Sequence, residues 1–298
     1  MMLDAFSAPG RFLRGNLHTH SDRSDGALPP AEVCRRYRQA GYDFLCISDH
    51  FLDRFGFPLT DTTPFRTEGF TTLLGAELHG PQTHLGDHWH ILAVGLPSDF
   101  AAAGDSEAGP DLARRAREAG AFVGIAHPQW YGLNTADGLS IDAAHAVEIY
   151  NHTCEMLSAR PDGVALLDQL LQEGRMLTGF AADDAHFKSN DPFGGWVMVK
   201  AEDMAPETIL EALKAGRYYA SQGPQIHDVR RDGDSLVVTT SPVRSIALAG
   251  RGARSAAVHG DGITEARLAL TSFAGSWCRL VVTDGAGRRA WAQPARID

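Results

Sequence analysis

The chain has 298 residues, of which 44% are hydrophobic, and its formal net charge at pH 7 is -10. This length is sufficient for one large α/β domain, or for one domain followed by a small module. The 37 acidic residues outnumber the 27 basic ones, which argues against a long nucleic acid as the main partner, because such binding depends on clustered cations.

Four cysteines form no C-x-x-C pair and no dense framework, so we expect a reduced, cytoplasmic compartment. The first 15 residues contain no basic segment followed by an apolar run, which argues against a signal peptide. Because no apolar run reaches the ~18 residues of a membrane-spanning helix, we also expect no membrane partner.

Short apolar runs alternate with amphipathic segments up to about residue 220. Such strand–helix alternation predicts a parallel sheet, either open or closed into a barrel. The expected strands lie within residues 11–18, 43–50, 71–79, 88–96, 121–128, 146–151, 175–186 and 195–201. The expected helices lie within residues 29–41, 109–120, 161–174 and 205–216, and several begin with proline and end before glycine. Residues 51–70 form a loop-like insertion that we expect near the mouth of a site.

The pattern changes after Gly216, where alternating apolar residues and Asp-Gly turns replace the helical segments. This pattern predicts a small antiparallel β module of about 75 residues. We therefore expect two domains, residues 1–220 and residues 221–298. The β module has no recognisable ligand set, and its role stays open.

Almost every expected strand ends on a side chain that can bind a metal ion. Active sites of parallel α/β folds lie at the carboxyl ends of the strands, so these residues should meet at one edge. His18 and His20 are two residues apart and share a face, as do Asp184 and His186. Imidazoles and carboxylates together suit zinc, manganese or iron, and their number exceeds the ligands of one ion. The residues at strand ends are His18, His20, Asp49, His50, Glu77, His79, His88, His90, His127, Glu148, Asn151, Asp183, Asp184 and His186.

Five motifs in order, LHTH-x4-DG, ISDH, GAE, AHP and DDAH, resemble the polymerase and histidinol phosphatase (PHP) superfamily of metal-dependent phosphoesterases. The resemblance covers residues 15 to about 220. In the tail, GRYYASQGP and GRRAWAQP are similar to the branch named after a carbaryl hydrolase, in which a small β-sandwich follows the PHP domain. The resemblance implies a distorted (β/α)7 barrel with a C-terminal antiparallel, sandwich-like module.

The resemblance also implies a site for two or three divalent ions. His18 and His20 would hold one ion with Glu77 and Asp184. Glu77 would bridge to a second ion held by His90 and His127. The third ion would be bound by Asp25, His50 and His186, although many family members have His at the position of Asp25. His84, His88 and His90 compete for one ligand position, and we favour His90 because it opens the run HILAVG.

The remaining polar residues receive weaker assignments. Glu148 and Asn151 would lie behind the ligands rather than on the metal. Cys154 is expected to be a packed thiol. His79, His84, His145, His227 and His259 are expected to be structural or solvent-facing. The candidates for substrate contact are Arg160, Lys188 and Arg217, with Asp183, His152 and Tyr218 as further ones.

Three functions remain open at this point. The first is hydrolysis of a small phosphate mono- or diester, in which a water shared by two ions, its pKa lowered toward ~7, attacks phosphorus. The second is hydrolysis of a carbamate, ester or amide at the same site. The third is a non-catalytic metal-binding module. The sequence does not predict an oligomeric state, the native metal or the general acid.

Overall fold

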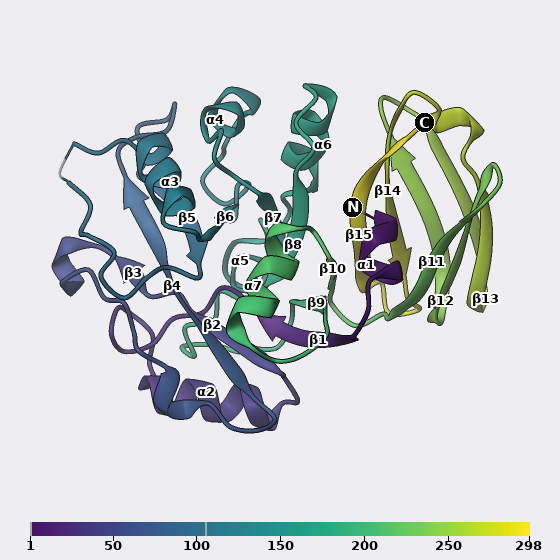
Figure 1. Ribbon diagram of the computed structural model, residues 1–298. Coiled ribbons are helices and arrows are strands. Elements are labelled where there is room, and N and C mark those ends of the chain that lie inside the picture. The colour runs from purple at the N-terminus through teal and green to yellow at the C-terminus, as the bar shows by residue number, and fades with distance from the viewer. Residues whose placement is uncertain (1, 105) are drawn as a thin grey trace.

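The computed structural model describes residues 2–104 and 106–298. An α/β region lies beside a β region, and both termini lie in or next to the β region (Figure 1). The helices are α1 (Met2–Ser7), α2 (Pro30–Gln39), α3 (Gly109–Glu118), α4 (Thr135–Ser140), α5 (His152–Ser158), α6 (Val164–Gln172) and α7 (Pro206–Lys214). The strands of the α/β region are β1 (Arg11–Asn16), β2 (Phe44–Ile47), β3 (His50–Phe51), β4 (Thr71–Gly80), β5 (Trp89–Val94), β6 (Phe122–Ile125), β7 (Ala146–Asn151), β8 (Thr178–Ala182) and β9 (Trp196–Ala201). The remaining strands are β10 (Tyr218–Ser221), β11 (Ile226–Asp232), β12 (Ser235–Gly250), β13 (Ser255–Ala269), β14 (Ser276–Thr283) and β15 (Arg289–Ile297).

The helices that the sequence predicts have clear start and stop signals. Proline occupies the first turn of α2, α3 and α7, where its missing N–H costs no helical hydrogen bond. Gly41, Gly120 and Gly216 follow these helices with positive φ, a conformation that glycine adopts without steric cost. The short helices α1, α4 and α5 lie outside the predicted segments. The last two are capped by asparagine side chains, from Asn134 and Asn151.

The sheet is mixed rather than purely parallel, which corrects the expectation from the sequence. Its order through the α/β region is β9-β1-β2-β4-β5-β6-β7-β8. Strands β1, β2 and β4 pair in parallel, as do β6, β7 and β8, whereas β5 is antiparallel to both β4 and β6. The two parallel sets therefore point the same way, and their carboxyl ends lie at one edge together with the beginning of β5.

The segments that follow the first and last strands of this series meet at that edge. Thr19 and Ala185 form a parallel bridge, and the His20 N–H donates to the carbonyl of Ala185 at 2.9 Å. The Asp184 N–H donates to the carbonyl of His18 at 2.8 Å. These bonds connect residues far apart in sequence at the end where the polar residues collect. The mixed α/β class is confirmed, and a closed seven-stranded barrel stays a prediction.

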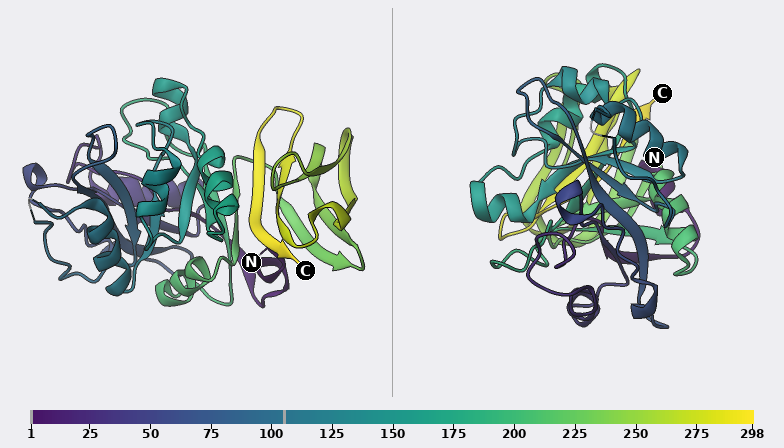
Figure 2. Two further views of the ribbon diagram at one scale, coloured as in Figure 1. Left: turned by 90° about the horizontal axis from the view of Figure 1, so that it is seen from above. Right: turned by 90° about the vertical axis from the view of Figure 1, so that its left-hand side faces the viewer.

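The C-terminal strands and α1 surround a hydrophobic cluster of their own. Met2 of α1 belongs to this cluster with residues of β11, β12, β14 and β15. Figure 2 shows α1 beside these strands. β10 pairs with β9 on one side and with β15 on the other, so the expected boundary between residues 220 and 221 falls inside a strand shared by both regions. The division into two domains and the sandwich-like form stay predictions.

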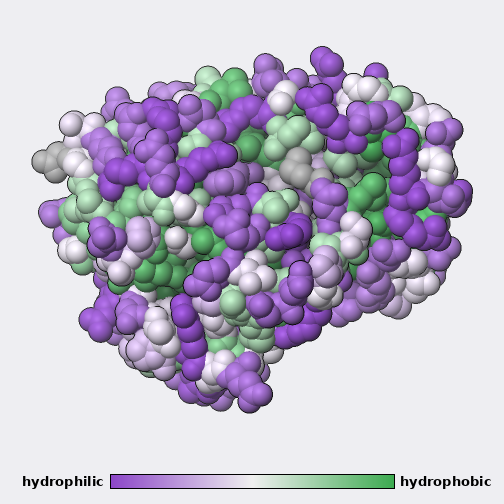
Figure 3. Space-filling view, viewed as in Figure 1, coloured by the Kyte–Doolittle hydropathy of each residue, from purple (hydrophilic) through white to green (hydrophobic). Residues whose placement is uncertain are grey.

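The two regions are held together by apolar and polar contacts. Trp277 and Trp291 belong to the same hydrophobic cluster as Leu170 of α6. Arg279 makes a bidentate ion pair with Asp168, with N–O distances of 2.6 and 2.7 Å. Figure 3 shows a face on which hydrophilic side chains predominate and apolar patches are small. Within the described ranges, no helix is long and apolar enough to cross a membrane.

Gln293 of β15 tests the contact between the β region and the α/β region. Its buried side-chain amide accepts from the Gly179 N–H at 2.7 Å and donates to the Gly179 carbonyl at 2.9 Å. We expect Gln293→Ala to lower the free energy of unfolding by about 1–3 kcal/mol, because both backbone groups lose their partners in a buried place. Urea denaturation measures this change, and the exposed Gln172→Ala is the matched control. Equal urea midpoints for Gln293→Ala and Gln172→Ala would contradict a stabilising role of the hydrogen bonds between Gln293 and Gly179.

Candidate metal centre

The fold brings all nine residues that the sequence suggested as ligands to one edge of the sheet. Those from strands come from the carboxyl ends of the parallel strands, except for His90, which lies at the beginning of antiparallel β5. Asp25 reaches the same place from the loop between β1 and α2. The nine residues are His18, His20, Asp25, His50, Glu77, His90, His127, Asp184 and His186. We call them the nine-residue cluster.

Glu77 lies at the centre of this cluster, and its side chain is fully buried. Its Oε1 is 2.7 Å from His90 Nδ1 and 3.0 Å from His127 Nε2. Its Oε2 is 2.6 Å from His50 Nδ1. The same oxygen is 3.6 and 3.7 Å from the Nε2 atoms of His20 and His18. One carboxylate therefore faces imidazoles on both sides, as a bridging ligand must.

Asp184 faces the histidine pair that follows β1. Its Oδ1 is 2.9 Å from His20 Nε2 and 3.3 Å from His18 Nε2. His18 and His20 offer two nitrogen donors, and Asp184 and Glu77 offer two oxygen donors. Potential ligand atoms of His18, His20 and Glu77 lie within 4.8 Å of one another, as do those of His18, His127 and Asp184.

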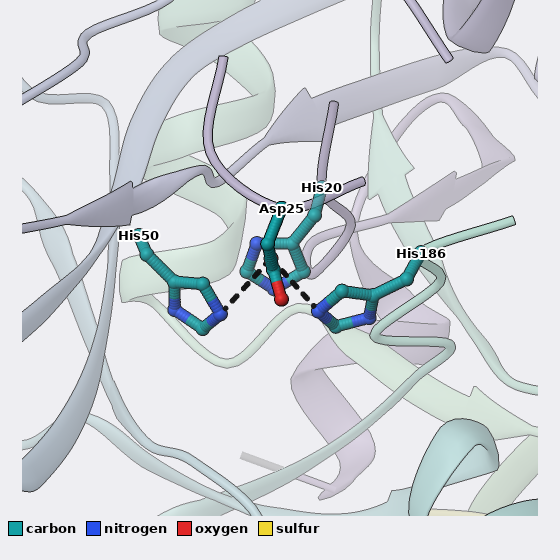
Figure 4. A group of neighbouring side chains, drawn as sticks. All are labelled: His20, Asp25, His50 and His186. Carbon is teal, nitrogen blue, oxygen red and sulfur yellow. Dashed lines mark ion pairs between the residues drawn. The ribbon is translucent and has the colours of Figure 1, made fainter. Parts of the chain in front are cut away.

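A further group lies nearer to solvent and includes Asp25. Its Oδ1 is 3.3 Å from His50 Nε2 and 3.2 Å from His186 Nε2. Figure 4 shows Asp25 between these two rings, with His20 behind them. Asp25 therefore lies beside the two histidines with which the sequence analysis grouped it, and its role as a ligand stays a prediction.

The charges of these groups are strongly coupled. Burial, together with the neighbouring His186 and His50, lowers the pKa of His20 to about 4. Burial opposes protonation of His50 as well, but the carboxylates of Glu77 and Asp25 raise its pKa to about 10. The pKa of Glu77 is held well below its ordinary value by His50, His90 and His18, although burial alone would raise it. In the protein alone, protons on histidines neutralise the buried carboxylates.

Glu148 and Asn151 contact residues of the nine-residue cluster from the side away from its centre, and their role behind metal ligands stays a prediction. Glu148 Oε1 is 3.0 Å from His18 Nδ1, and its Oε2 accepts from the His127 N–H at 2.6 Å. The Asn151 amide donates to Glu148 Oε2 and to Asp184 Oδ2, both at 3.1 Å. A carboxylate on Nδ1 fixes the tautomer of His18, so that Nε2 presents its lone pair to the cluster.

Asp49 fixes the loop that carries Asp25. Its buried carboxylate accepts four hydrogen bonds of 2.6–2.8 Å, from the Ser21 N–H and from the hydroxyls of Ser21, Ser24 and Thr60. It thereby joins the loop after β1 to the loop 51–70. The sequence placed Asp49 at a strand end without assigning it this role.

Two residues of the cluster have unusual backbone conformations. Asp184 has a φ of 55° and His127 a φ of 21°, in the region that residues other than glycine rarely adopt. Such conformations persist where the surrounding structure holds them. Here the Asp184 N–H donates to the His18 carbonyl and the His127 N–H donates to the Glu148 carboxylate, and these hydrogen bonds hold the two conformations.

The residues present fit a group of divalent cations. Among the described residues, five buried atoms of the cluster form no well-aligned hydrogen bond: His18 Nε2, His20 Nδ1, His127 Nδ1, Asp25 Oδ1 and Glu77 Oε2. The atoms of His18, Asp25 and Glu77 have only the ion-pair contacts described above. Buried polar groups are rarely left unpaired, and a bound ion is a common reason when they have no protein partner. Three of these atoms, on His18, Asp25 and Glu77, face other potential ligands. Neutral nitrogen and carboxylate oxygen donors suit zinc, manganese or iron.

His79 lies inside the cluster, which the sequence analysis did not expect. It was assigned a structural or solvent-facing role, but its Nε2 is 2.9 Å from His50 Nδ1 and 3.7 Å from Glu77 Oε2. His79 is two residues from Glu77 in β4, and such residues share a face of a strand. This spacing could have predicted that His79 lies beside Glu77. His88 is exposed at the cavity wall, and His84 pairs with Asp137 instead.

The cluster opens into a cavity of about 790 Å³. Lys188 lines it, with its Nζ 3.5 Å from Asp25 Oδ2, and Arg160 lines an adjoining hollow. Cys154 also lines the cavity, and burial raises the pKa of its thiol, as a packed cysteine requires.

Arg217 is not brought to the site, which corrects its assignment as a substrate contact. Its carbonyl accepts from the Lys200 N–H, and Lys200 pairs with Phe12 at the beginning of β1, opposite the cluster. Asp183 and Tyr218 are buried away from the cavity. Asp183 accepts from the Tyr37 hydroxyl and from the N–H groups of 193–195, and Tyr218 donates to Thr178. His152 bonds to the Tyr150 hydroxyl.

Comparison with solved structures supports the fold. The chain is similar to a two-domain protein from Bacteroides vulgatus ATCC 8482 that contains a predicted PHP-like metal-dependent phosphoesterase, with 17% identity, a TM-score of 0.52 and 94% of each chain covered. This likeness spans both regions and confirms the resemblance to PHP-like proteins at the level of the fold. No family model matches the chain, and no curated protein matches it significantly.

Two less similar structures were also found. A protein from Bifidobacterium adolescentis ATCC 15703, provisionally described as a metal-dependent phosphoesterase, has 15% identity and a TM-score of 0.40 over 61% of this chain and 89% of its own. An amidohydrolase from Chromobacterium violaceum, solved with bound sulfate and no metal, has 15% identity and a TM-score of 0.41 over 58% and 87%.

Glu148→Gln tests whether the Glu148 carboxylate orients His18 for metal binding. The substitution removes the charge behind His18 but preserves the shape of the side chain. We expect metal affinity to fall about 10–100-fold, as typically follows loss of such a partner. Competition with a chromophoric chelator measures the affinity, and the exposed Glu173→Gln is the control. Unchanged affinity in Glu148→Gln would show that His18 needs no carboxylate partner.

Binding of metal should release protons. At pH 7 the metal-free protein holds a proton on His50, whose pKa is raised to about 10, and this proton must leave when His50 becomes a ligand. The affinity for Mn²⁺ or Zn²⁺ should therefore increase as the pH rises from 6 to 8. Calorimetry in two buffers of different ionisation enthalpy counts the protons released. A binding heat that does not depend on the buffer would contradict this expectation.

Proposed function

We propose that this protein is a metal-dependent phosphoesterase that hydrolyses a small phosphate mono- or diester. The observation that carries the proposal is the fully buried Glu77 carboxylate, which faces imidazoles on both sides within a cluster of nine nitrogen and oxygen donors. The PHP-like fold and the order of the five motifs support it. A distorted seven-stranded PHP-type barrel is part of the same proposal.

The nine residues of the cluster would hold two or three zinc, manganese or iron ions. His18, His20 and Asp184 would share one ion with Glu77, and His90 and His127 would bind a second. Asp25, His50 and His186 would hold a third. Bound ions of this kind lower the pKa of water and neutralise phosphoryl oxygens, which is the electrostatic help that phosphoryl transfer requires.

The chain's own residues contribute orientation and charge. Glu148 and Asn151 hold His18, His127 and Asp184 in place through the hydrogen bonds described above. Lys188 and Arg54 line the cavity and add positive charge where an anionic substrate would enter. Arg160 would contact more distant parts of a substrate. These residues give an otherwise acidic chain a locally favourable place for a phosphate ester, and we propose a cytoplasmic location without a nucleic-acid or membrane partner.

One observation favours a second candidate, a hydrolase of carbamates, esters or amides. Part of the cavity wall is apolar and includes Leu52, Trp130 and Leu157. The same ions would then polarise a carbonyl group, and attack would occur at carbon instead of phosphorus. Such an enzyme would need no cationic side chains for a phosphate group, and we expect its activity to be insensitive to inorganic phosphate.

Hydrolysis by the manganese-loaded protein separates the two candidates. An aryl phosphate monoester, an aryl phosphodiester and an aryl carbamate are tested in parallel, with Asp184→Asn as the blank. We expect turnover of at least one phosphate ester, abolished in the variant and inhibited by inorganic phosphate. Asp184→Asn should lower kcat/KM by at least about 100-fold, since a charged ligand and its hydrogen bond to His20 are both affected.

The other outcomes are equally informative. Turnover of the carbamate alone, without inhibition by phosphate, would replace the first candidate by the second. Binding of metal with no turnover of any substrate would contradict both and favour a non-catalytic metal-binding module. Metal content measured on the same samples distinguishes an inactive site from an empty one.

A further inference from the structure

The two sides of the cavity differ in chemistry. The side formed by the loops after β1, β3 and β8 is mainly charged and is lined by Asp25, Asp53, Arg54, Lys188 and Asp191, with Leu52 beside them. His90, His127 and Trp130 lie on the side of β5 and β6. Lys188 stands 3.5 Å from Asp25, so one cation of this charged side adjoins the group formed by Asp25, His50 and His186.

Trp130 is the main apolar group on the other side. Its ring centroid is 5.4 Å from that of His90 and 5.2 Å from that of His127, and both pairs have edge-on geometry. Yet 42% of its surface is exposed. A large aromatic side chain that touches two potential ligands and remains open to the cavity offers a surface for an apolar group of a substrate.

Two further observations extend this surface. Leu157 of α5 lines the same cavity with 69% of its surface exposed. The Arg160 guanidinium donates to the Trp130 carbonyl at 3.3 Å, which fixes the segment after α5 against the Trp130 turn. A second hollow of about 420 Å³ adjoins the cavity, and the two share His88, His90 and Trp130 in their walls. There is therefore space beyond Trp130 for a group much larger than a phosphate.

We propose that Trp130 is a specificity-determining residue that selects esters of apolar, ring-bearing alcohols. The leaving alcohol would lie against Trp130 and Leu157, and the phosphoryl group would lie toward Asp25, His50 and Lys188. This inference rests on the proposed phosphoesterase function and adds the class of the alcohol and its direction in the cavity.

The test compares esters that differ in the size of the apolar alcohol. The manganese-loaded protein is assayed with 2-naphthyl phosphate, phenyl phosphate and glycerol phosphate. We expect kcat/KM to be highest for the naphthyl ester. The naphthyl-to-glycerol ratio should fall about tenfold in Trp130→Ala, and Trp130→Phe should restore part of it, because ring contacts of this kind are worth about one factor of ten. Leu139→Ala, which removes an exposed apolar side chain outside both cavity walls, is the matched control.

A binding measurement gives a second readout that does not depend on turnover. Calorimetry with naphthylphosphonate and methylphosphonate should show tighter binding of the former, with the difference reduced in Trp130→Ala. Metal content of each variant shows whether loss of Trp130 has disturbed His90 or His127. Turnover of phosphate esters with the same ratio in wild type and Trp130→Ala would overturn this inference and leave the proposed function intact. Absence of turnover for every phosphate ester would overturn the proposed function itself.

Discussion

The burial of the Glu77 carboxylate is the constraint on which the rest of this site depends. An ionised carboxylate without a partner is costly in a protein interior, and here imidazoles face both of its oxygens. The histidines in turn lie so close together that the charges of several protonated rings would repel one another. Divalent cations satisfy both requirements at once, because they neutralise the carboxylate and use the lone pairs of the imidazoles. The chemistry of the donors thus points to metal ions more directly than any single motif.

The architecture of the sheet serves this requirement. The parallel strands deliver His18, Glu77, His127 and Asp184 to one edge, and the reversed β5 presents His90 there from its beginning. The bonds between the segments after β1 and β8 bring His20 and His186 close together, with ring centroids 4.2 Å apart. Backbone hydrogen bonds between segments far apart in the sequence therefore set the distances between residues of the nine-residue cluster.

Buried polar side chains that do not face the cavity support the nine-residue cluster. Glu148 and Asn151 orient the histidines, Asp49 fixes the loop of Asp25, and Asp183 holds the turn at 193–195. The cavity itself has a mainly charged side, with Arg54, Lys188 and several aspartates, and a side on which Trp130 and Leu157 are exposed. This division makes the cavity suitable for an ester whose two halves differ in polarity, and it explains why two kinds of hydrolase remain to be distinguished by experiment.

The sequence alone determined those features that depend on neighbouring residues. Proline and glycine marked the ends of α2, α3 and α7, and the ligand types stood at the strand ends, because capping and strand termination are local. Only the tertiary structure decided the direction of β5, the inclusion of His79, the exclusion of Arg217 and the place of Trp130 beside His90. Each of these depends on which strands pair and in which register. Pairing energies arise between residues far apart in the chain, so no local pattern records them.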